Sequence, residues 1–342
     1  MNSAVANPNI AAIGCGHWGK NLVRNFVQLR SLRWICDTSD ALLQMQAQLY
    51  PDVSLTNQFE TVLADSETKA VVIATPAALH YAQVKQAILA DKDVFVEKPL
   101  ALRYWQGKEL VALAVARGKI LMVGHILEYH PAIALLKDWV QRGELGKLLY
   151  LYSNRLNLGK VRQEENILWS FAPHDISVIT SLVGEDPISV RASGGTYLQD
   201  NIADVTTTNL LFAGEVRSHI FVSWLHPYKE QKLVAIGDRK MAVFDDTVRE
   251  GKLKIYDKGI DWQAGLPVPR QTAETTLFLE ETEPLRLECK HFLDCLQSRQ
   301  QPLTGSDNAL RVLKVLEASQ LSLERGGSTV SLAEIEAQGQ GE

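Results

Sequence analysis

The feature that most constrains this chain is a glycine-rich segment near its start, Gly14-Cys15-Gly16-His17-Trp18-Gly19. An apolar run, residues 10–13, precedes it, and residues 21–30 follow it with apolar side chains at helical spacing. Strand, glycine turn and helix in this order are typical of dinucleotide-binding folds. The glycines permit a tight turn and close approach of a pyrophosphate, and the helix N-terminus offers N–H groups to the phosphates. We therefore expect Gly14, Gly16, His17, Trp18 and Gly19 to contact a dinucleotide.

An acidic residue follows at the position where a dinucleotide fold needs one. A second apolar run ends at Asp37, roughly 20 residues beyond the glycine loop, where a carboxylate accepts hydrogen bonds from the adenosine ribose. A negative charge there repels a 2′-phosphate, so the sequence favours NAD over NADP. Asp37 could alternatively cap the next helix.

Apolar runs alternate with helical patterns through residues 1–123. Strands are expected at 71–74, 94–96 and 120–123, and helices at 79–90 and 103–117. This alternation predicts a doubly wound parallel sheet, an α/β Rossmann domain. Thr75 and Pro76 follow one strand, so they either line the nicotinamide side of the crevice or only form a turn.

Lys98 follows another strand of this domain, within Glu97-Lys98-Pro99. Strand ends of a parallel sheet face the ligand crevice, so a lysine there is suited to holding a substrate oxygen. The alternative is an ion pair with Glu97 or another acid at the domain edge.

The pattern changes at residue 124. Helices are expected at 131–142, 175–183, 284–297 and 308–323, and strands within 147–156, 188–196, 203–212, 215–224, 232–236, 241–244 and 253–256. Consecutive strands without crossover helices predict an α+β domain with a large, mostly antiparallel open sheet over 124–336, followed by a disordered tail, 337–342. The helices are too few to cover both faces of this sheet, which favours a homo-oligomer, dimer or tetramer, packed through it.

Several polar side chains of the second half are candidate site residues. His174, placed just before the helix expected from Asp175, could take a proton from an alcohol, although such a histidine is more often structural. Asp175 is expected to cap that helix. Basic and amide-bearing clusters would suit a polyhydroxylated or phosphorylated substrate, although each member could be solvated or structural. The clusters contain His125 and Tyr129, and then Arg155, Asn157, Lys160 and Arg162.

Composition excludes some classes of partner. The net charge is -5 and the pI about 6.0, which gives no electrostatic footprint for nucleic acid or an anionic membrane. No apolar run approaches the ~18 residues of a membrane span. Four scattered cysteines suit reduced thiols in a cytoplasmic protein, without a disulfide framework or a metal site.

The glycine loop, Thr75-Pro76, Glu97-Lys98-Pro99 and Ala172-Pro173-His174-Asp175 together resemble the glucose–fructose oxidoreductase, inositol dehydrogenase and MocA-like family over nearly the whole chain. The resemblance implies an NAD-dependent oxidoreductase with a Rossmann domain and an open sheet that builds dimers and tetramers. It implies Lys98 and His174 as the catalytic pair, and Glu97, Lys98 and His80 among the cofactor contacts. Many members have an aspartate four residues before the histidine, where this chain has Ser170.

Segments 124–131 and 153–159 resemble the branch that acts on nucleotide-linked amino sugars, the UDP-N-acetylglucosamine 3-dehydrogenases. That implies oxidation of the C3 hydroxyl of UDP-N-acetylglucosamine to a ketone for a following aminotransferase, in lipid A and lipopolysaccharide precursor synthesis. The substrate pyrophosphate would then lie near Arg155, Lys160 or Arg162. A free sugar, an inositol or a UDP-sugar acid remains an alternative substrate, and a cofactor-sensing regulator without turnover is an alternative of another class.

Overall fold

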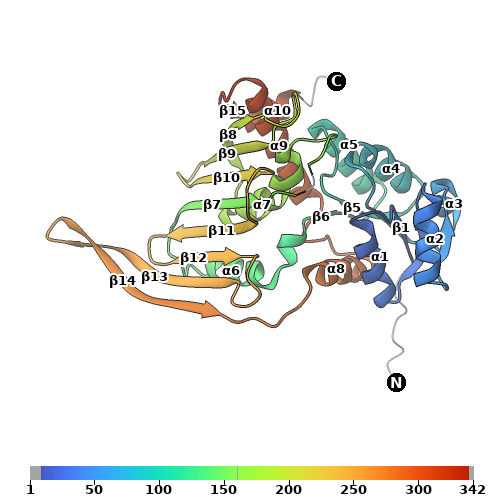
Figure 1. Ribbon diagram of the computed structural model, residues 1–342, viewed down its shortest axis with the longest axis horizontal. Coiled ribbons are helices and arrows are strands. Elements are labelled where there is room, and N and C mark those ends of the chain that lie inside the picture. The colour runs from blue at the N-terminus through green and yellow to red at the C-terminus, as the bar shows by residue number, and fades with distance from the viewer. Residues whose placement is uncertain (1–8, 160, 339–342) are drawn as a thin grey trace. The chain divides into compact units, whose positions relative to one another are not determined.

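The computed structural model describes residues 9–159 and 161–338 (Figure 1). The chain forms two compact units. The first runs to Ile126 and adds Glu283–Leu313, and the second contains Leu127–Thr282 and the chain from Lys314 onward. All of 124–336 was expected in the second domain, so the placement of Glu283–Leu313 differs from that expectation. The reason is that this segment packs its apolar side chains on the first sheet.

The first unit is built on a parallel sheet of six strands, ordered β3-β2-β1-β4-β5-β6. Its strands are β1 (Ile10–Ile13), β2 (Leu32–Cys36), β3 (Ser54–Thr56), β4 (Ala70–Ile73), β5 (Asp93–Glu97) and β6 (Leu121–Gly124). The connecting helices are α1 (Gly19–Gln28), α2 (Asp40–Leu49), α3 (Phe59–Ala64), α4 (Ala77–Leu89) and α5 (Tyr104–Ala116). The predicted Rossmann domain is confirmed, with β3 as an additional edge strand.

Helices cover both faces of this sheet, which explains its continuous apolar strands. On one face, Val94 and Val96 of β5 join a core with side chains of α4 and α5. On the other face, α1 and α2 pack on β1 and β2. There Phe95 meets Phe292 of α8 (Pro284–Ser298), with ring centroids 5.6 Å apart. This contact fixes α8 to the first unit.

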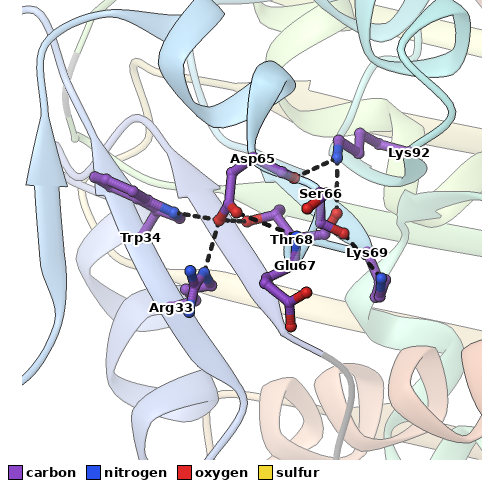
Figure 2. Close-up of polar contacts among 8 residues, drawn as sticks. All are labelled: Arg33, Trp34, Asp65, Ser66, Glu67, Thr68, Lys69 and Lys92. Carbon is purple, nitrogen blue, oxygen red and sulfur yellow. Dashed lines mark hydrogen bonds and ion pairs between the residues drawn. The ribbon is translucent and has the colours of Figure 1, made fainter.

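Asp65 organises a polar cluster at the amino ends of the strands (Figure 2). Arg33 Nε and Trp34 Nε1, both on β2, donate to its carboxylate at 2.6 and 2.7 Å, and Thr68 Oγ1 donates at 2.8 Å. Lys92 Nζ donates to the carbonyls of Asp65 and Thr68 at 2.7 and 2.8 Å. Because ligands of such sheets bind at the carboxyl ends, this cluster stabilises the unit at the opposite edge.

The second unit holds a sheet of nine strands, ordered β14-β13-β12-β11-β7-β10-β9-β8-β15. All neighbours are antiparallel except β7 and β10, so the predicted mostly antiparallel sheet is confirmed. The strands are β7 (Leu148–Leu156), β8 (Pro187–Gly195), β9 (Val205–Phe212), β10 (Arg217–Ser223), β11 (Glu230–Gly237), β12 (Met241–Asp245), β13 (Leu253–Gln263), β14 (Leu266–Leu277) and β15 (Val330–Ser331).

The helices of the second half differ from expectation at two places. Besides α6 (Pro131–Gln141), the chain forms α7 (Ile167–Val183), which begins eight residues before the expected start at Asp175. Helix α9 (Ser306–Glu324) begins in the first unit and ends in the second. Helix α10 (Leu332–Gln338) includes Ala337 and Gln338, so the disorder expected from 337 is wrong for these two residues; 339–342 lie outside the described residues.

Strands β13 and β14 form a long hairpin that extends beyond the other strands of its sheet (Figure 1). Only residues 253–256 of it were expected. The turn residues Ala264 and Gly265 have φ of 51° and 80°, the backbone of a two-residue hairpin turn. Pro267 and Pro269 lie on β14 at the edge of the sheet, where a missing N–H breaks no ladder.

Candidate cofactor and catalytic site

The glycine loop connects β1 to α1, and its glycines meet different constraints. Gly14 has φ +87°, and a Cβ on Gly19 would lie 2.0 Å from the Gly14 carbonyl oxygen, so the fold itself requires both glycines. A Cβ on Gly16 would meet nothing within 4 Å. Packing therefore does not explain Gly16, whereas close approach of a pyrophosphate does. The loop fits the phosphates of a dinucleotide.

Asp37 follows β2 and faces the glycine loop. Its Oδ2 accepts from the Cys15 backbone N–H at 2.8 Å, and its Oδ1 accepts from the Ser39 N–H at 2.9 Å. The alternative of a helix cap is wrong, because the N-cap of α2 is Ser39, whose hydroxyl accepts from Leu42. The loop contact holds a fixed negative charge beside the expected adenosine ribose site. Sequence reasoning missed Cys15, whose backbone N–H and Sγ, the latter at 3.4 Å, both donate to Asp37 Oδ2.

His80 joins the turns that follow β4 and β5. This buried imidazole in α4 lies 2.7 Å from the Pro99 carbonyl oxygen through Nδ1 and 2.9 Å from the Thr75 carbonyl oxygen through Nε2. Thr75 Oγ1 also donates to Gln83 at 2.6 Å. His80 thus fixes the position of the Thr75-Pro76 turn relative to the Lys98-Pro99 turn. Its structural role is to orient these two turns. A direct cofactor contact by this residue remains a prediction.

Glu97 ends β5 and bonds to the glycine loop. Trp18 Nε1 donates to Glu97 Oε1 at 2.5 Å, so the two predicted cofactor residues share one site. Desolvation by the surrounding protein raises the pKa of Glu97 to about 7, while the Trp18 hydrogen bond and the charge of Lys98 oppose the rise. Glu97 therefore changes charge near neutral pH, next to the lysine expected to act on substrate.

His125 follows β6 in the same unit and is fully buried. Burial, and then the charge of Lys98, lower its pKa to about 3, so the ring is neutral at physiological pH. A neutral imidazole near Lys98 fits the predicted substrate role without adding charge. Tyr129, four residues on, is buried in the second unit.

His174 lies inside α7, which corrects the expectation that it precedes a helix. The cap of α7 is Asn166, whose Oδ1 accepts from the Trp169 N–H at 3.2 Å. Asp175, expected as the cap, instead accepts from Arg155 Nε at 2.7 Å and Nη2 at 3.2 Å. Pro173 lies inside the helix, and the helix continues through it.

The remaining predicted substrate residues are dispersed. Arg155 is buried, and its pairing with Asp175 accounts for it structurally. Asn157 lies at the end of β7, where its backbone N–H donates to Ser223. Arg162 is exposed and pairs with Glu165 at 3.2 Å. Lys160 lies outside the described residues.

The described residues contain neither a membrane-spanning helix nor a metal-binding cluster. No helix in the part of the chain that the structure describes is long and apolar enough to cross a bilayer. Within residues 9–159 and 161–338, no group of three or more histidine, cysteine or acidic side chains is placed to hold a metal ion.

Two family descriptions match this chain. Residues 8–125 match the oxidoreductase family with an NAD-binding Rossmann fold, and residues 133–243 match the GFO/IDH/MocA C-terminal domain. The UDP-N-acetylglucosamine 3-dehydrogenase of Acidithiobacillus ferrooxidans is 25% identical over 307 residues, 88% of this chain and 92% of that protein. The scyllo-inositol 2-dehydrogenase (NAD(+)) of Bacillus subtilis is 24% identical over 331 residues, 92% and 94% of the two chains.

Solved structures agree on the fold. The Acidithiobacillus ferrooxidans UDP-N-acetylglucosamine 3-dehydrogenase structure has a TM-score of 0.82 at 23% identity and covers 93% of this chain and 98% of its own. A levoglucosan dehydrogenase in complex with NADH and levoglucosan has a TM-score of 0.83 at 20% identity, covering 95% and 99%. With matches across both units and a glycine loop built for a dinucleotide, the chain belongs to the NAD-binding GFO/IDH/MocA oxidoreductase family.

Proposed function

We propose that this oxidoreductase oxidises a secondary ring hydroxyl of a sugar nucleotide, the C3 hydroxyl of UDP-N-acetylglucosamine. The observation that carries the proposal is the Glu97-Lys98-Pro99 turn. It lies at the carboxyl end of β5 and bonds through Glu97 to the glycine loop, so it sets a lysine beside the dinucleotide site. Similarity to a UDP-N-acetylglucosamine 3-dehydrogenase over 88% of this chain supports the choice of substrate.

In this proposal, Lys98 and His174 have separate roles at the reacting hydroxyl. Lys98 binds the substrate oxygen and stabilises its alkoxide-like form. His174 accepts the hydroxyl proton as the carbon is oxidised. NAD, when bound, supplies the hydride acceptor.

Polar residues after β7 are the proposed contacts of the substrate diphosphate. Arg162 keeps an exposed side chain, and Asn157 and Lys160 precede it in the same segment. Arg155 is not among these proposed ligands, because its guanidinium is buried against Asp175. His125 and Tyr129 remain proposed contacts of the sugar.

A second candidate keeps the chemistry with a different substrate, an inositol or a free sugar. The scyllo-inositol 2-dehydrogenase of Bacillus subtilis is similar over 92% of this chain at almost the same identity as the sugar-nucleotide enzyme. The proposed diphosphate contacts around Arg162 would suit a sugar nucleotide, because an inositol presents no diphosphate.

We propose that a second copy of this chain covers the open face of the nine-stranded sheet. Along β7, Leu151, Ser153 and Arg155 are buried toward the helices, whereas Tyr150 and Tyr152 on the opposite face stay half-buried. There Tyr152 stacks on His219 at 5.3 Å. Light scattering coupled to size-exclusion chromatography would give a dimer or tetramer, and a monomer at micromolar concentration would contradict the proposal.

The proposed product is a 3-keto sugar nucleotide, which an aminotransferase would consume on a route to lipid A and lipopolysaccharide precursors. We place this reaction in the cytoplasm. All four cysteines are free and buried, which fits a reducing compartment.

An absorbance assay of NADH formation tests the substrate. NAD or NADP would be combined with a panel of UDP-sugars, free sugars and inositols. We expect turnover with NAD and UDP-N-acetylglucosamine. Turnover with inositol but with no UDP-sugar would overturn the sugar-nucleotide proposal, and tight NAD binding without turnover on the whole panel would identify a cofactor sensor.

Lys98→Met tests the catalytic role of the lysine. We expect kcat to fall by a factor on the order of 10² to 10³, as for loss of an oxyanion donor, with NAD affinity largely unchanged. Lys108→Met on α5 is the matched control and should retain activity. Unimpaired turnover of Lys98→Met would refute the assignment.

A further inference from the structure

A second acid lies buried in the first unit, apart from every role proposed above. Glu288 of α8 has an exposed fraction of 0%, and within the described residues neither of its carboxylate oxygens has a hydrogen-bond partner. Its neighbours on the helix, Leu285, Cys289 and Phe292, are buried as well. An ionised carboxylate without a partner is too costly in such surroundings, so Glu288 must be neutral.

The packing of α8 on β5 places Glu288 against Glu97. Phe95 and Glu97 point to the same face of β5, and Glu288 and Phe292 are four residues apart on one face of α8. Two strand residues and four helix residues both span roughly 6 to 7 Å, so the contact of Phe95 with Phe292 allows the two acids to lie opposite each other. The charge of Glu97 acts on Glu288, which places the two acids on the same side of that contact. Burial, and then the charge of Glu97, hold the pKa of Glu288 well above its ordinary value.

Glu97 itself is held in place from its other sides. Trp18 of the glycine loop donates to Oε1, and a Cβ on Gly124 of β6 would lie 3.0 Å from Oε2. Apart from Glu288, the titratable groups facing Glu97 are Lys98 and Cys289. Burial raises the pKa of Cys289, so that thiol is neutral. Glu97 is therefore the acid of this cluster that titrates near neutral pH.

We propose that Glu288 is a positioning residue for cofactor binding, a neutral carboxylic acid that donates to the Glu97 carboxylate through one bridging water and so favours its anionic form. The proton stays on Glu288. The nicotinamide ring of NAD⁺ carries a positive charge that NADH lacks, so an anion at the end of β5 favours the oxidised cofactor. Glu288 thereby acts on cofactor affinity without touching the cofactor.

Calorimetric measurement of NAD⁺ affinity between pH 6 and 9 tests this role. In the wild type, affinity should rise with pH through the ionisation of Glu97, whose pKa is about 7. Glu288→Leu removes the donor and should move the midpoint to higher pH by about one unit, the size of one hydrogen bond to a charged group. NAD⁺ affinity should then fall roughly fivefold at pH 7 and match the wild type at pH 9.

Two controls separate donation from packing. Glu288→Gln keeps a neutral donor of the same shape and should restore the wild-type midpoint. Leu293→Ala loosens the same helix at a buried position while leaving both acids, and should not move the midpoint. An unshifted Glu288→Leu profile would overturn the proposal, as would a shift of equal size in Glu288→Gln or Leu293→Ala.

A spectroscopic measurement covers the case in which Glu288→Leu fails to fold. The infrared spectrum of the wild type at pH 8 should contain the carbonyl band of a protonated carboxylic acid, and Glu288→Gln should lose it. Absence of that band in the wild type would show Glu288 ionised and the proposal wrong. These measurements need no sugar substrate, so their failure leaves the proposed function standing.

Discussion

Replacing Asp37 should convert the cofactor preference of this protein, because the carboxylate is held rigidly at the ribose position. Cys15 N–H and Ser39 N–H donate to its two oxygens at 2.8 and 2.9 Å, so the charge cannot swing away from an incoming 2′-phosphate. Two unit charges about 5 Å apart at an effective dielectric constant of about 20 repel by roughly 3 kcal/mol. Removing that repulsion should raise NADP⁺ affinity by about two orders of magnitude.

Two variants separate charge from hydrogen bonding in this prediction. Asp37→Asn removes the charge and keeps an acceptor, so NADP⁺ affinity should rise while NAD⁺ affinity falls only a few-fold. Asp37→Ser also shortens the side chain, and loss of a charged hydrogen bond to the ribose should lower NAD⁺ affinity by roughly tenfold or more. The ratio of NADP⁺ affinity to NAD⁺ affinity should then rise by about three orders of magnitude in all.

Titration calorimetry with each cofactor gives the ratio directly. Asp40→Asn, at an exposed acid of the first turn of α2, is the matched control and should leave the ratio unchanged. If Asp37→Asn bound NADP⁺ no better than the wild type, electrostatic exclusion by Asp37 would be refuted.

Three further predictions test the scaffold around the site. Gly19→Ala should lower the melting temperature, because its Cβ would meet the Gly14 carbonyl at 2.0 Å. Gly16→Ala should keep the melting temperature and lose NAD⁺ affinity. An equal fall of the melting temperature in both variants would contradict this. Asp65→Asn should cost about 2 kcal/mol in urea unfolding at pH 7. Hydrogen bonds from Arg33, Trp34 and Thr68 hold the pKa of Asp65 below its ordinary value, so this stabilisation is present above about pH 4 and is lost progressively as the pH falls further. A stability difference between wild type and variant that does not narrow between pH 5 and pH 2 would refute it. Arg155→Met should destabilise the second unit by about 3 to 5 kcal/mol by leaving Asp175 unpaired in the interior, and a stable variant with only a raised KM would return Arg155 to the substrate site.

The Rossmann domain was predictable because its signals are local. The run from β1 through Gly14 and Gly19 to α1 combines a buried strand, two sterically required glycines and a helix within fewer than thirty residues. Asp37 lies at the end of the next apolar run. Strand β3 was missed because its three residues are half-exposed and depend on β2 for their pairing.

The errors in the second half come from interactions between distant residues. Helix α8 was recognised as a helix, but its place in the first unit depends on contacts such as Arg24 with Glu283, 259 positions apart. The β13–β14 hairpin has polar residues and two prolines that weaken a strand pattern. Ala264-Gly265 was nevertheless a visible signal of a two-residue hairpin turn.

The replacement of the usual family aspartate by Ser170 gains meaning from the structure of α7. The obvious substitute, Asp175, is adjacent to His174 in sequence, but both of its oxygens accept from Arg155 in the interior. A carboxylate neutralised in this way gives little stabilisation to a protonated imidazole nearby. Ser170, one helical turn before His174 on the same face, offers a hydroxyl in place of a charge. His174 must therefore act, in the proposed reaction, without stabilisation of its protonated form by a carboxylate of α7. In that reaction, Lys98 must therefore contribute more to lowering the pKa of the substrate hydroxyl.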